Sequence, residues 1–340
     1  MKSLISYKRL VPLVVIVLLI TMLVGCQPLP SSSGPTVQET VQPVTQQFSG
    51  KLTMWMLDVG QGDCLLFKSP SGRFLLVDGG PTDSGTAVLA ALNQLGVKEI
   101  DTLIVSHAHE DHIGGLDAVL AKYPAQKAYL PKMTSTTRAY EDMWLRFKQG
   151  HTKIVYPQAG TEIPWDQQVK VEVLGPVNDD YEELNDGSLV ARLEFGQTSF
   201  LLTGDITIPV EEDLLSRGLN PPVTVLKVAH HGSNGSTGKQ LLDKIRPKLA
   251  LISVGQGNDY GHPGLMTINR LKAVGANILR TDQQGTIRLE SNGEKVMVYQ
   301  EKPVPKEKVK LIGNAKSGVW HRSDCGHLPT RGSQVFFNSS

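Results

Sequence analysis

One six-residue segment constrains this chain more than any other, because it holds three histidines and an aspartate. It reads His107-Ala108-His109-Glu110-Asp111-His112, between an apolar strand-like segment (101–106) and a helix-like segment (113–124). A polar surface loop is the weaker interpretation, since buried elements border the segment on both sides. Alternate residues leaving a strand point the same way, so His107 and His109 can share one ion. Imidazole and carboxylate ligands in a compact set suit a divalent metal, zinc first and manganese as the alternative.

Further candidate ligands follow other strand-like segments. Asp205 ends LLTGD, His230 and His231 follow LKVA, and His262 comes shortly after LALISVG. Each of these is a weak signal by itself, since a lone aspartate after a strand is usually a turn residue or a helix cap. Together they predict that ligands converge at one edge of the fold, where Asp205 is suited to bridge two metals.

The rest of the chain alternates between strand-like and helix-like segments. Three strand-like segments open the pattern (LTMWMLDVG, DCLLFKS and RFLLVDGG), and two more (NILRTD and TIRLES) form an expected final pair near Tyr299. A hydrophobic fraction of 40% and a charged fraction of 20% argue against disorder and against a multi-span membrane protein. Strands mixed with helices predict an α/β fold over residues 51–300. The expected form is an αββα sandwich of two mixed sheets with the helices outside.

The amino terminus reads as an export signal. Lys8 and Arg9 precede the apolar run Leu10–Val24, which is shorter than the roughly 20 residues that span a bilayer. The run ends in LVGC, which looks like a bacterial lipobox. Residues 1–26 are therefore predicted to be a lipoprotein signal peptide with Cys26 as the lipidated residue, and an uncleaved signal anchor is the alternative. Two acyl chains would anchor the protein stably outside the cytoplasmic membrane.

The segments on either side of the predicted domain lack its apolar pattern. Residues 27–50 are rich in Pro, Ser, Thr and Gln and almost free of charge, which predicts a disordered tether. Residues 301–310 are charged and contain proline, so they are expected to be a second linker before a short tail at 311–340. Cys64 and Cys325 could pair, but Cys64 lies in an apolar segment and is better explained as a small buried hydrophobe.

The His-rich segment resembles the HxHxDH motif of the metallo-β-lactamase superfamily. The stretch from Met54 to about Leu289 is similar to one branch of it, the hydrolase domain at the carboxyl end of the competence protein ComEC. The shared stretches are LDVGQGD (57–63), LLVDGG (75–80), SHAHEDHIGG (106–115), LLTGD (201–205), LKVAHHGS (226–233) and YGHPG (260–264). Their order and spacing make the resemblance specific, and it implies the sandwich fold and a hydrolase activity.

The resemblance also implies a set of metal ligands: His107, His109, Asp111, His112, Asp205, His230 and His262. In that set the first two histidines bind one metal, Asp111 and His112 bind the other, and Asp205 lies between them. His231 is the alternative, either supporting a ligand residue or facing the substrate. Asp111 and His231 are therefore the expected catalytic residues, with Asp111 orienting the nucleophile.

One departure from the family pattern concerns a further histidine that many members place before the bridging aspartate. No histidine lies between His151 and Asp205, and Asn185 or Asp186 stands about where it is expected. Asp78, like Asp58 and Asp63, borders glycines and would most often cap backbone amides there. Asp78 can instead support a ligand histidine through a hydrogen bond, as Asn185 can from its position near the site. Hydroxyls in the loop at 233–237 (Ser233, Ser236 and Thr237) either hold a phosphate or, as the favoured reading, are solvated.

The tail resembles a short zinc module related to that of the Ada repair protein. The usual pattern continues to a further pair of cysteines, which this chain lacks. His321 and Cys325 alone cannot close a tetrahedral zinc site, so no metal is expected there.

The function implied by the resemblance is metal-assisted hydrolysis with one or two metals. The expected substrate is a phosphodiester, first of all DNA or RNA outside the membrane. A net charge of +1 shows no overall excess of positive charge for binding nucleic acid, but it is compatible with a local basic groove. Two alternatives remain. One is a small phosphoester or a cell-envelope phosphodiester of the phosphorylcholine type. The other, from a different class, is a non-catalytic binding lipoprotein on the same fold.

Overall fold

The computed structural model describes residues 48–178, 180–218, 222–300, 310–314, 320–322 and 334–338. The predicted signal peptide, its Cys26, Cys325 and most of the two predicted linkers lie outside these residues. In the described part of the chain, no helix combines the length and apolar character needed to cross a membrane. The predicted domain boundaries stay predictions. The sandwich itself has its first strand at Leu52–Met56 and its last at Val296–Gln300.

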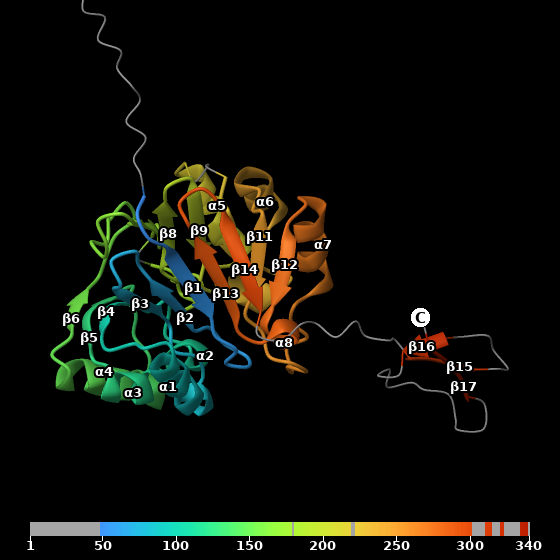
Figure 1. Cartoon of the computed structure of the whole chain (residues 1–340), viewed down its shortest axis with the longest axis horizontal. Helices are drawn as coiled ribbons and strands as arrows, with labels where there is room; N and C mark the ends of the chain where they lie inside the picture. The colour runs from blue at the N-terminus through green and yellow to red at the C-terminus, as the bar shows by residue number, and fades with distance from the viewer. Residues whose placement is uncertain are drawn as a thin grey trace, which may run out of the picture. The chain divides into compact units, whose positions relative to one another are not determined.

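Two sheets form the centre of the fold (Figure 1). The first sheet has eight strands, in the order β14 (Val296–Gln300), β13 (Ile287–Ser291), β1 (Leu52–Met56), β2 (Leu65–Lys68), β3 (Phe74–Val77), β4 (Ile100–Ile104), β5 (Ala125–Tyr129) and β6 (Lys153–Val155). The second has six, in the order β12 (Asn277–Arg280), β11 (Leu249–Ile252), β10 (Val225–Lys227), β9 (Thr198–Leu202), β8 (Val190–Phe195) and β7 (Lys170–Gly175). Each sheet contains parallel and antiparallel pairs.

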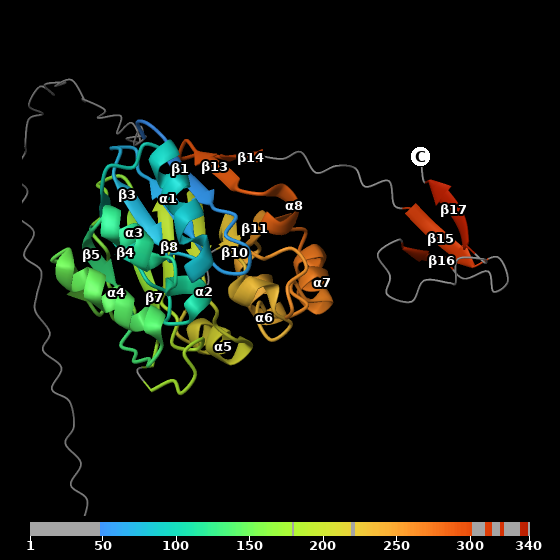
Figure 2. The same cartoon turned by 90° about the horizontal axis from the view of Figure 1, so that it is seen from below.

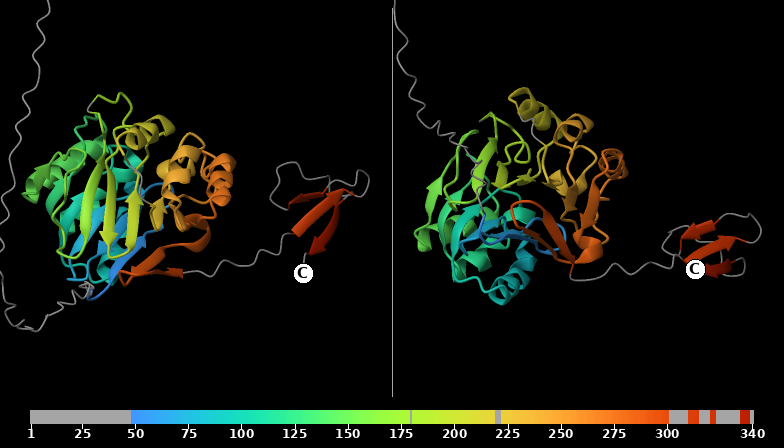
Figure 3. Two further views of the ribbon diagram at one scale, coloured as in Figure 1. Left: turned by 90° about the horizontal axis from the view of Figure 1, so that it is seen from above. Right: turned by 45° about the horizontal axis from the view of Figure 1, so that its top comes forward.

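Helices cover the outer face of each sheet (Figure 2). On the first sheet these are η1 (Thr82–Ser84), α1 (Gly85–Gln94), α2 (Glu110–Ile113), α3 (Leu116–Lys122) and α4 (Arg138–Gln149). On the second, shown in yellow to orange in Figure 3, they are α5 (Ile208–Ser216), α6 (Lys239–Ile245) and α7 (Leu265–Ala273). The short elements η2 (Ala229–Gly232) and α8 (Thr281–Gln284) follow strands of the second sheet. The predicted αββα sandwich of two mixed sheets is confirmed.

Three hydrophobic cores hold these layers together. In β1, Leu52, Met54 and Met56 point into the core between the sheets, whereas Trp55 packs toward the outer helices. In β3 every residue is buried, because Leu75 and Val77 face the inner core while Phe74 and Leu76 face the helices. A strand covered on both sides reads as a continuous apolar run, which explains LLV before the first Asp-Gly-Gly turn. Cys64 is fully buried in the core beneath these helices, as expected for a small hydrophobe.

The structure differs from the sequence expectation in several elements. Helices α4 and α5 were not expected, nor was the edge strand β14. The expected final pair of strands is not a pair, since β12 lies at the edge of the second sheet and β13 pairs with β1 in the first. The helix expected over 113–124 begins earlier, at Glu110, and is interrupted between α2 and α3. Gly114 and Gly115 lie at that break, where a Cβ atom would collide with the backbone of Thr82 and Gly79.

The tail forms a separate three-stranded sheet. Its strands are β15 (Lys310–Asn314), β16 (Trp320–Arg322) and β17 (Gln334–Asn338), with β15 in the middle. Both pairings are antiparallel. His321 lies in β16, whereas Cys325 lies outside the described residues.

Candidate metal centre

The candidate residues come from the carboxyl ends of strands in both sheets. Asp78 follows β3, and the His-rich segment follows β4, its parallel neighbour. In the second sheet Asp205 follows β9, and the two adjacent histidines follow β10, again parallel neighbours. The carboxyl ends of parallel strands meet at one edge of a sheet, which is where α/β folds place their ligands. The two sheets therefore bring segments about a hundred residues apart to one site.

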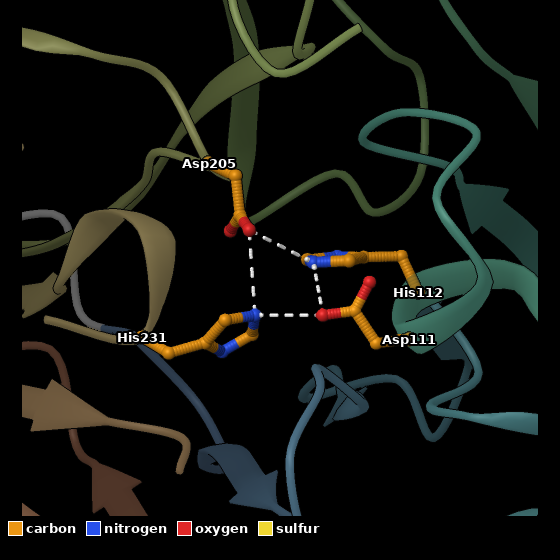
Figure 4. Close-up of side chains that lie close together, drawn as sticks. All are labelled: Asp111, His112, Asp205 and His231. Carbon is orange, nitrogen blue, oxygen red and sulfur yellow. Dashed lines mark hydrogen bonds and ion pairs between the residues drawn. The ribbon is translucent and has the colours of Figure 1, made fainter. Parts of the chain in front are cut away.

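Four side chains point toward one another at this edge (Figure 4). Asp111, His112, Asp205 and His231 each offer one ligand atom, and these atoms lie within 4.8 Å of one another. Asp205 Oδ2 is 3.2 Å from His112 Nε2 and 3.3 Å from His231 Nε2. Asp111 Oδ2 completes the group at 3.1 Å from His231 Nε2 and 3.9 Å from His112 Nε2.

This group fits a divalent metal. Two ligand atoms that bind one tetrahedral zinc ion at 2.0–2.2 Å lie about 3.3 Å apart, close to most of the separations in the cluster. His112 Nε2 is fully buried and faces the carboxylates of Asp205 and Asp111. A buried ring nitrogen that faces two carboxylates in this way is well placed to share an ion with them. The donor set of two imidazoles and two carboxylates suits zinc or manganese.

Hydrogen bonds behind the cluster fix how its two imidazoles face the site. His231 Nδ1 donates to the carbonyl oxygen of Ser253 at 2.9 Å, since a carbonyl can only accept. His112 Nδ1 lies 2.8 Å from Asp78 Oδ2. Asp78 thus has the role that the sequence offered as an alternative to turn capping, a hydrogen bond to a ligand histidine. Asp78 also accepts hydrogen bonds from the backbone and hydroxyl of Ser106. With Nδ1 fixed as the donor, each Nε2 can bind a metal that displaces its proton.

His107 and His109 form a second pair beside this cluster. His107 Nε2 lies 3.0 Å from His109 Nδ1, and the rings meet edge to face. The His107 ring is fully buried and its centroid is 4.1 Å from that of His112. Two ring nitrogens this close can bind one ion together, as the resemblance implies for this pair. The assignment to a first or second metal stays a prediction.

The adjacent histidines of η2 have different surroundings. His231 is buried inside the four-residue cluster, whereas His230 is half-buried and lies beyond it, with its ring 5.5 Å from that of His262. Both residues have left-handed backbone conformations, with φ of 50° and 51°. Such a conformation is strained in residues other than glycine, and it turns consecutive side chains in different directions. The geometry thus favours His231 as the ligand in this cluster, where the resemblance implies His230.

A cavity of about 360 Å³ opens onto the cluster. The residues that line it are Gln61, His109, Glu110, Asp111, Asn185, Asp205, His230, His231, Tyr260 and His262. Asn185 Oδ1 is buried without a hydrogen-bond partner in the described part of the chain, as is His262 Nδ1. Asp186 accepts a hydrogen bond from the Thr207 hydroxyl instead. Of the two residues near the position of the missing histidine, Asn185 is therefore the one that faces the site.

Electrostatics in the cluster are dominated by burial and by opposite charges. Burial opposes ionisation of Asp205, but the imidazoles of His231 and His112 and the ammonium of Lys227 hold its pKa well below the usual range. Burial disfavours the charged form of His231, yet Asp205 and Asp111 outweigh it and raise its pKa to about 9. Burial lowers the pKa of His230 and of His262, so these cavity histidines are neutral at pH 7.

Two residues at the base of the site were missed as site residues in the sequence. Lys227, the last residue of β10, is almost fully buried and forms an ion pair with Asp63. Its Nζ also lies 3.5 Å from Asp205 Oδ1 and donates to the Gly204 carbonyl oxygen. The expectation that Asp63 caps a turn is wrong, because its carboxylate is ion-paired in the interior. The available signal was the lysine itself, since a charge inside the apolar run VTVLKVA needs a buried partner.

The other turn and loop residues have structural contacts. Asp58 accepts a hydrogen bond from the Gly60 amide, as expected for a turn aspartate. In the loop after η2, the Ser233 hydroxyl accepts from Gly235 and the Thr237 hydroxyl accepts from Ala229. These hydroxyls stabilise the loop that carries the paired histidines.

The chain is similar to several known proteins. The chain is 33% identical over 250 residues to ComE operon protein 3 of Bacillus subtilis, which covers 68% of this chain and 32% of that protein. It is 32% identical over 241 residues to the competence protein ComA of Neisseria gonorrhoeae, and the match covers 70% of this chain and 32% of that protein. The chain thus spans about a third of the length of these curated relatives. Among solved structures it is similar to the metallo-beta-lactamase fold protein YhfI of Bacillus subtilis, with 15% identity and a TM-score of 0.44. This match covers 67% of this chain and 95% of that chain.

The family model described as the metallo-beta-lactamase superfamily matches residues 57–256. This range contains the His-rich segment, Asp205 and both histidines of η2, which are the residues that the fold gathers at one edge. The chain belongs to the metallo-beta-lactamase superfamily.

Proposed function

We propose that this protein is a metal-dependent phosphodiesterase that cleaves nucleic acid outside the cytoplasmic membrane. The observation that carries the proposal is the four-residue cluster at the floor of an open cavity. Membership of the superfamily supports a metallo-hydrolase, and the similarity to the competence proteins makes a nucleic acid the first substrate to test. A divalent metal held by Asp111, His112, Asp205 and His231 would supply a water of lowered pKa and offset developing negative charge.

The charges that line the cavity explain why a phosphodiester would depend on the metal. The lining includes three carboxylates, those of Glu110, Asp111 and Asp205, and contains neither lysine nor arginine among its described residues. An anionic phosphate is repelled by such a surface unless a cation balances it. Metal-free protein should therefore bind the substrate phosphate poorly.

The chain's own residues can orient the reacting groups. The Asp111 carboxylate is held by His231 at 3.1 Å and remains partly exposed to the cavity, so it can accept a hydrogen bond from an attacking water. Glu110 is less free, because its carboxylate accepts a hydrogen bond from the Thr82 amide. His230 and His262 are neutral at pH 7 and face the same cavity, so each can accept a proton or bind a cation.

The test is a metal analysis of purified protein beside a hydrolysis screen. The substrates are bis-p-nitrophenyl phosphate, single-stranded DNA and a p-nitrophenyl ester of phosphorylcholine. His109→Ala should lose bound metal and nearly all turnover, while His151→Ala, at an exposed turn, should keep both. Hydrolysis of the phosphorylcholine ester alone would favour the cell-envelope alternative. Full metal content with no turnover on any ester would favour a binding protein.

The proposed location rests on the sequence of the amino terminus. Cys26 at the end of LVGC is the expected attachment point for two acyl chains, which give stable membrane binding. Cys26→Ala should abolish labelling by a radioactive fatty acid and release the protein from the membrane fraction. Unlabelled wild-type protein that still sediments with membranes would contradict the lipid anchor.

A further inference from the structure

A solvent-exposed tyrosine stands at the rim of the metal-centre cavity. Tyr260 lines the cavity and is 72% exposed, an unusual exposure for a large aromatic residue in an ordered loop. Its ring stacks on His262, with a centroid distance of 5.7 Å and an interplanar angle of 24°. The two rings are thus nearly parallel and offset, and most of the tyrosine remains open to solvent.

A line of rings leads from this tyrosine to the metal centre. His262 lies edge to face with His230 at 5.5 Å, and His230 lies 6.3 Å from His231 in the four-residue cluster. All four of these residues line the same cavity. A ligand with its reacting group at the cluster would therefore reach Tyr260 with the neighbouring part of its structure.

The loop that carries the tyrosine is braced by one side chain. The Asn258 carboxamide oxygen accepts from the backbone amides of Tyr260 and His262, at 3.2 and 3.0 Å. Its amide group donates to the carbonyl oxygens of Gly255 and His262, at 2.9 and 2.7 Å. The Gly255 amide in turn donates to Oε1 of Gln61, which also lines the cavity. The stacked rings are therefore held in place before any ligand binds, which reduces the entropy lost on binding.

We propose that Tyr260, supported by His262, is a stacking platform for an unpaired base next to the scissile phosphate. The inference rests on the proposed function and extends it to substrate selection: the favoured substrate is single-stranded nucleic acid. Base-to-aromatic stacking is tolerant of sequence, because every base has a π face. In a paired duplex the base would already be stacked on its neighbours and unavailable.

A quaternary ammonium group, as in phosphorylcholine, is the competing occupant. Such cations are usually recognised by a cage of several aromatic rings. Among the described residues that line this cavity, Tyr260 is the sole phenylalanine, tyrosine or tryptophan. A single flat ring with one imidazole beside it suits a flat base better than a spherical cation.

The test compares Tyr260→Ala and Tyr260→Phe with the wild type on two trinucleotides. One trinucleotide has bases throughout, and the other has abasic nucleosides on both sides of the scissile phosphate. Tyr260→Ala should raise KM for the normal trinucleotide by about 10-fold, within the range for loss of one stacked base. It should leave KM for the abasic trinucleotide within about twofold, and Tyr260→Phe should behave as wild type because it keeps the ring. Tyr156→Ala, a half-exposed tyrosine away from the cavity, is the matched control.

A binding measurement separates this inference from the proposed function. A phosphorothioate oligonucleotide that contains 2-aminopurine should lose fluorescence on binding the metal-loaded wild type, and less so with Tyr260→Ala. If the wild type cleaves neither trinucleotide, the proposed function fails. The fluorescence quenching of 2-aminopurine then decides by itself whether Tyr260 stacks on a base. Equal KM changes on both trinucleotides, or quenching that is unchanged in Tyr260→Ala, would overturn the platform. A KM penalty confined to the phosphorylcholine ester would assign the tyrosine to a choline group instead.

Discussion

His231 Nε2 lies 3.1 Å from Asp111 Oδ2, although the two residues are 120 positions apart and follow strands of different sheets. The contact joins the His-rich segment to η2 and closes the four-residue cluster. It also distinguishes between the two adjacent histidines, because His230 points away toward His262.

The first prediction concerns this pair. His231→Ala should remove one equivalent of bound metal, because it removes a buried ligand atom that faces Asp111 and Asp205. His230→Ala should keep that equivalent and change turnover alone, which reverses the order implied by the family resemblance. Metal stoichiometry of the two variants, measured by plasma mass spectrometry, decides the matter. Loss of metal from His230→Ala with full retention in His231→Ala would restore the implied order.

Asp78 should act on the metal through His112. Asp78→Asn exchanges a carboxylate acceptor for a carboxamide and weakens the hydrogen bond that orients the ring. Such supporting contacts change metal affinity by about 10–100-fold, so the dissociation constant should rise by that factor. Chelator competition measures it, with Asp58→Asn at an exposed turn as the matched control. Equal affinity in the two variants would show that Asp78 serves only the fold.

The buried Lys227–Asp63 ion pair should matter for stability. Lys227→Met leaves the Asp63 carboxylate without its lysine in the interior, and breaking a buried pair in this way costs about 3–5 kcal/mol. Lys227→Met/Asp63→Asn removes both charges and should recover most of the loss. Urea unfolding of the metal-free variants gives the values. Lys239→Met, which breaks the exposed i,i+4 pair with Asp243, should cost less than about 0.5 kcal/mol. A double variant no more stable than Lys227→Met would exclude the pairing as the cause.

Glu211 of α5 should make stability depend on pH. Burial raises the pKa of Glu211 to about 7, and the charge of Glu212 adds to the rise. The Gly238 and Thr237 amides, which donate to the carboxylate, and Arg270 of α7 lower this pKa but do not outweigh burial. The folded state therefore binds a proton that the unfolded state releases near its ordinary value of 4.5. The contribution of Glu211 to the free energy of unfolding is therefore fully present below pH 4.5. It falls by at most about 3 kcal/mol as the pH rises to about 7.

Glu211→Gln tests this linkage, because glutamine does not titrate. The free energy of unfolding of wild type minus variant should fall between pH 4.5 and pH 7 and then level off. Glu212→Gln, at an exposed neighbouring position, removes only the smallest contribution to this pKa and should leave most of the wild-type slope in place. A constant difference between wild type and Glu211→Gln over this range would contradict a raised pKa.

The layered fold and the main metal-binding segment can both be predicted from the sequence. Continuous apolar runs such as FLLV in β3 predict buried strands, and HAHEDH predicts ligands at the end of one of them. Both signals are local, since they depend on the periodicity of side chains along a strand and on donor atoms within six residues. Helices α4 and α5 were not predicted from the sequence, although α4 has the amphipathic spacing and the capping Thr137 typical of a helix.

Which groups meet in the site depends on how the two sheets pack together. Nothing local distinguishes His230 from His231. Both have a left-handed backbone, and a hydrogen bond to the Ser253 carbonyl oxygen holds His231 in the cluster. Likewise, the role of Asp63 depends on Lys227, which comes from the other sheet. A buried charge is stable only beside an opposite one, and a partner far away in sequence becomes visible only when the two sheets are packed together.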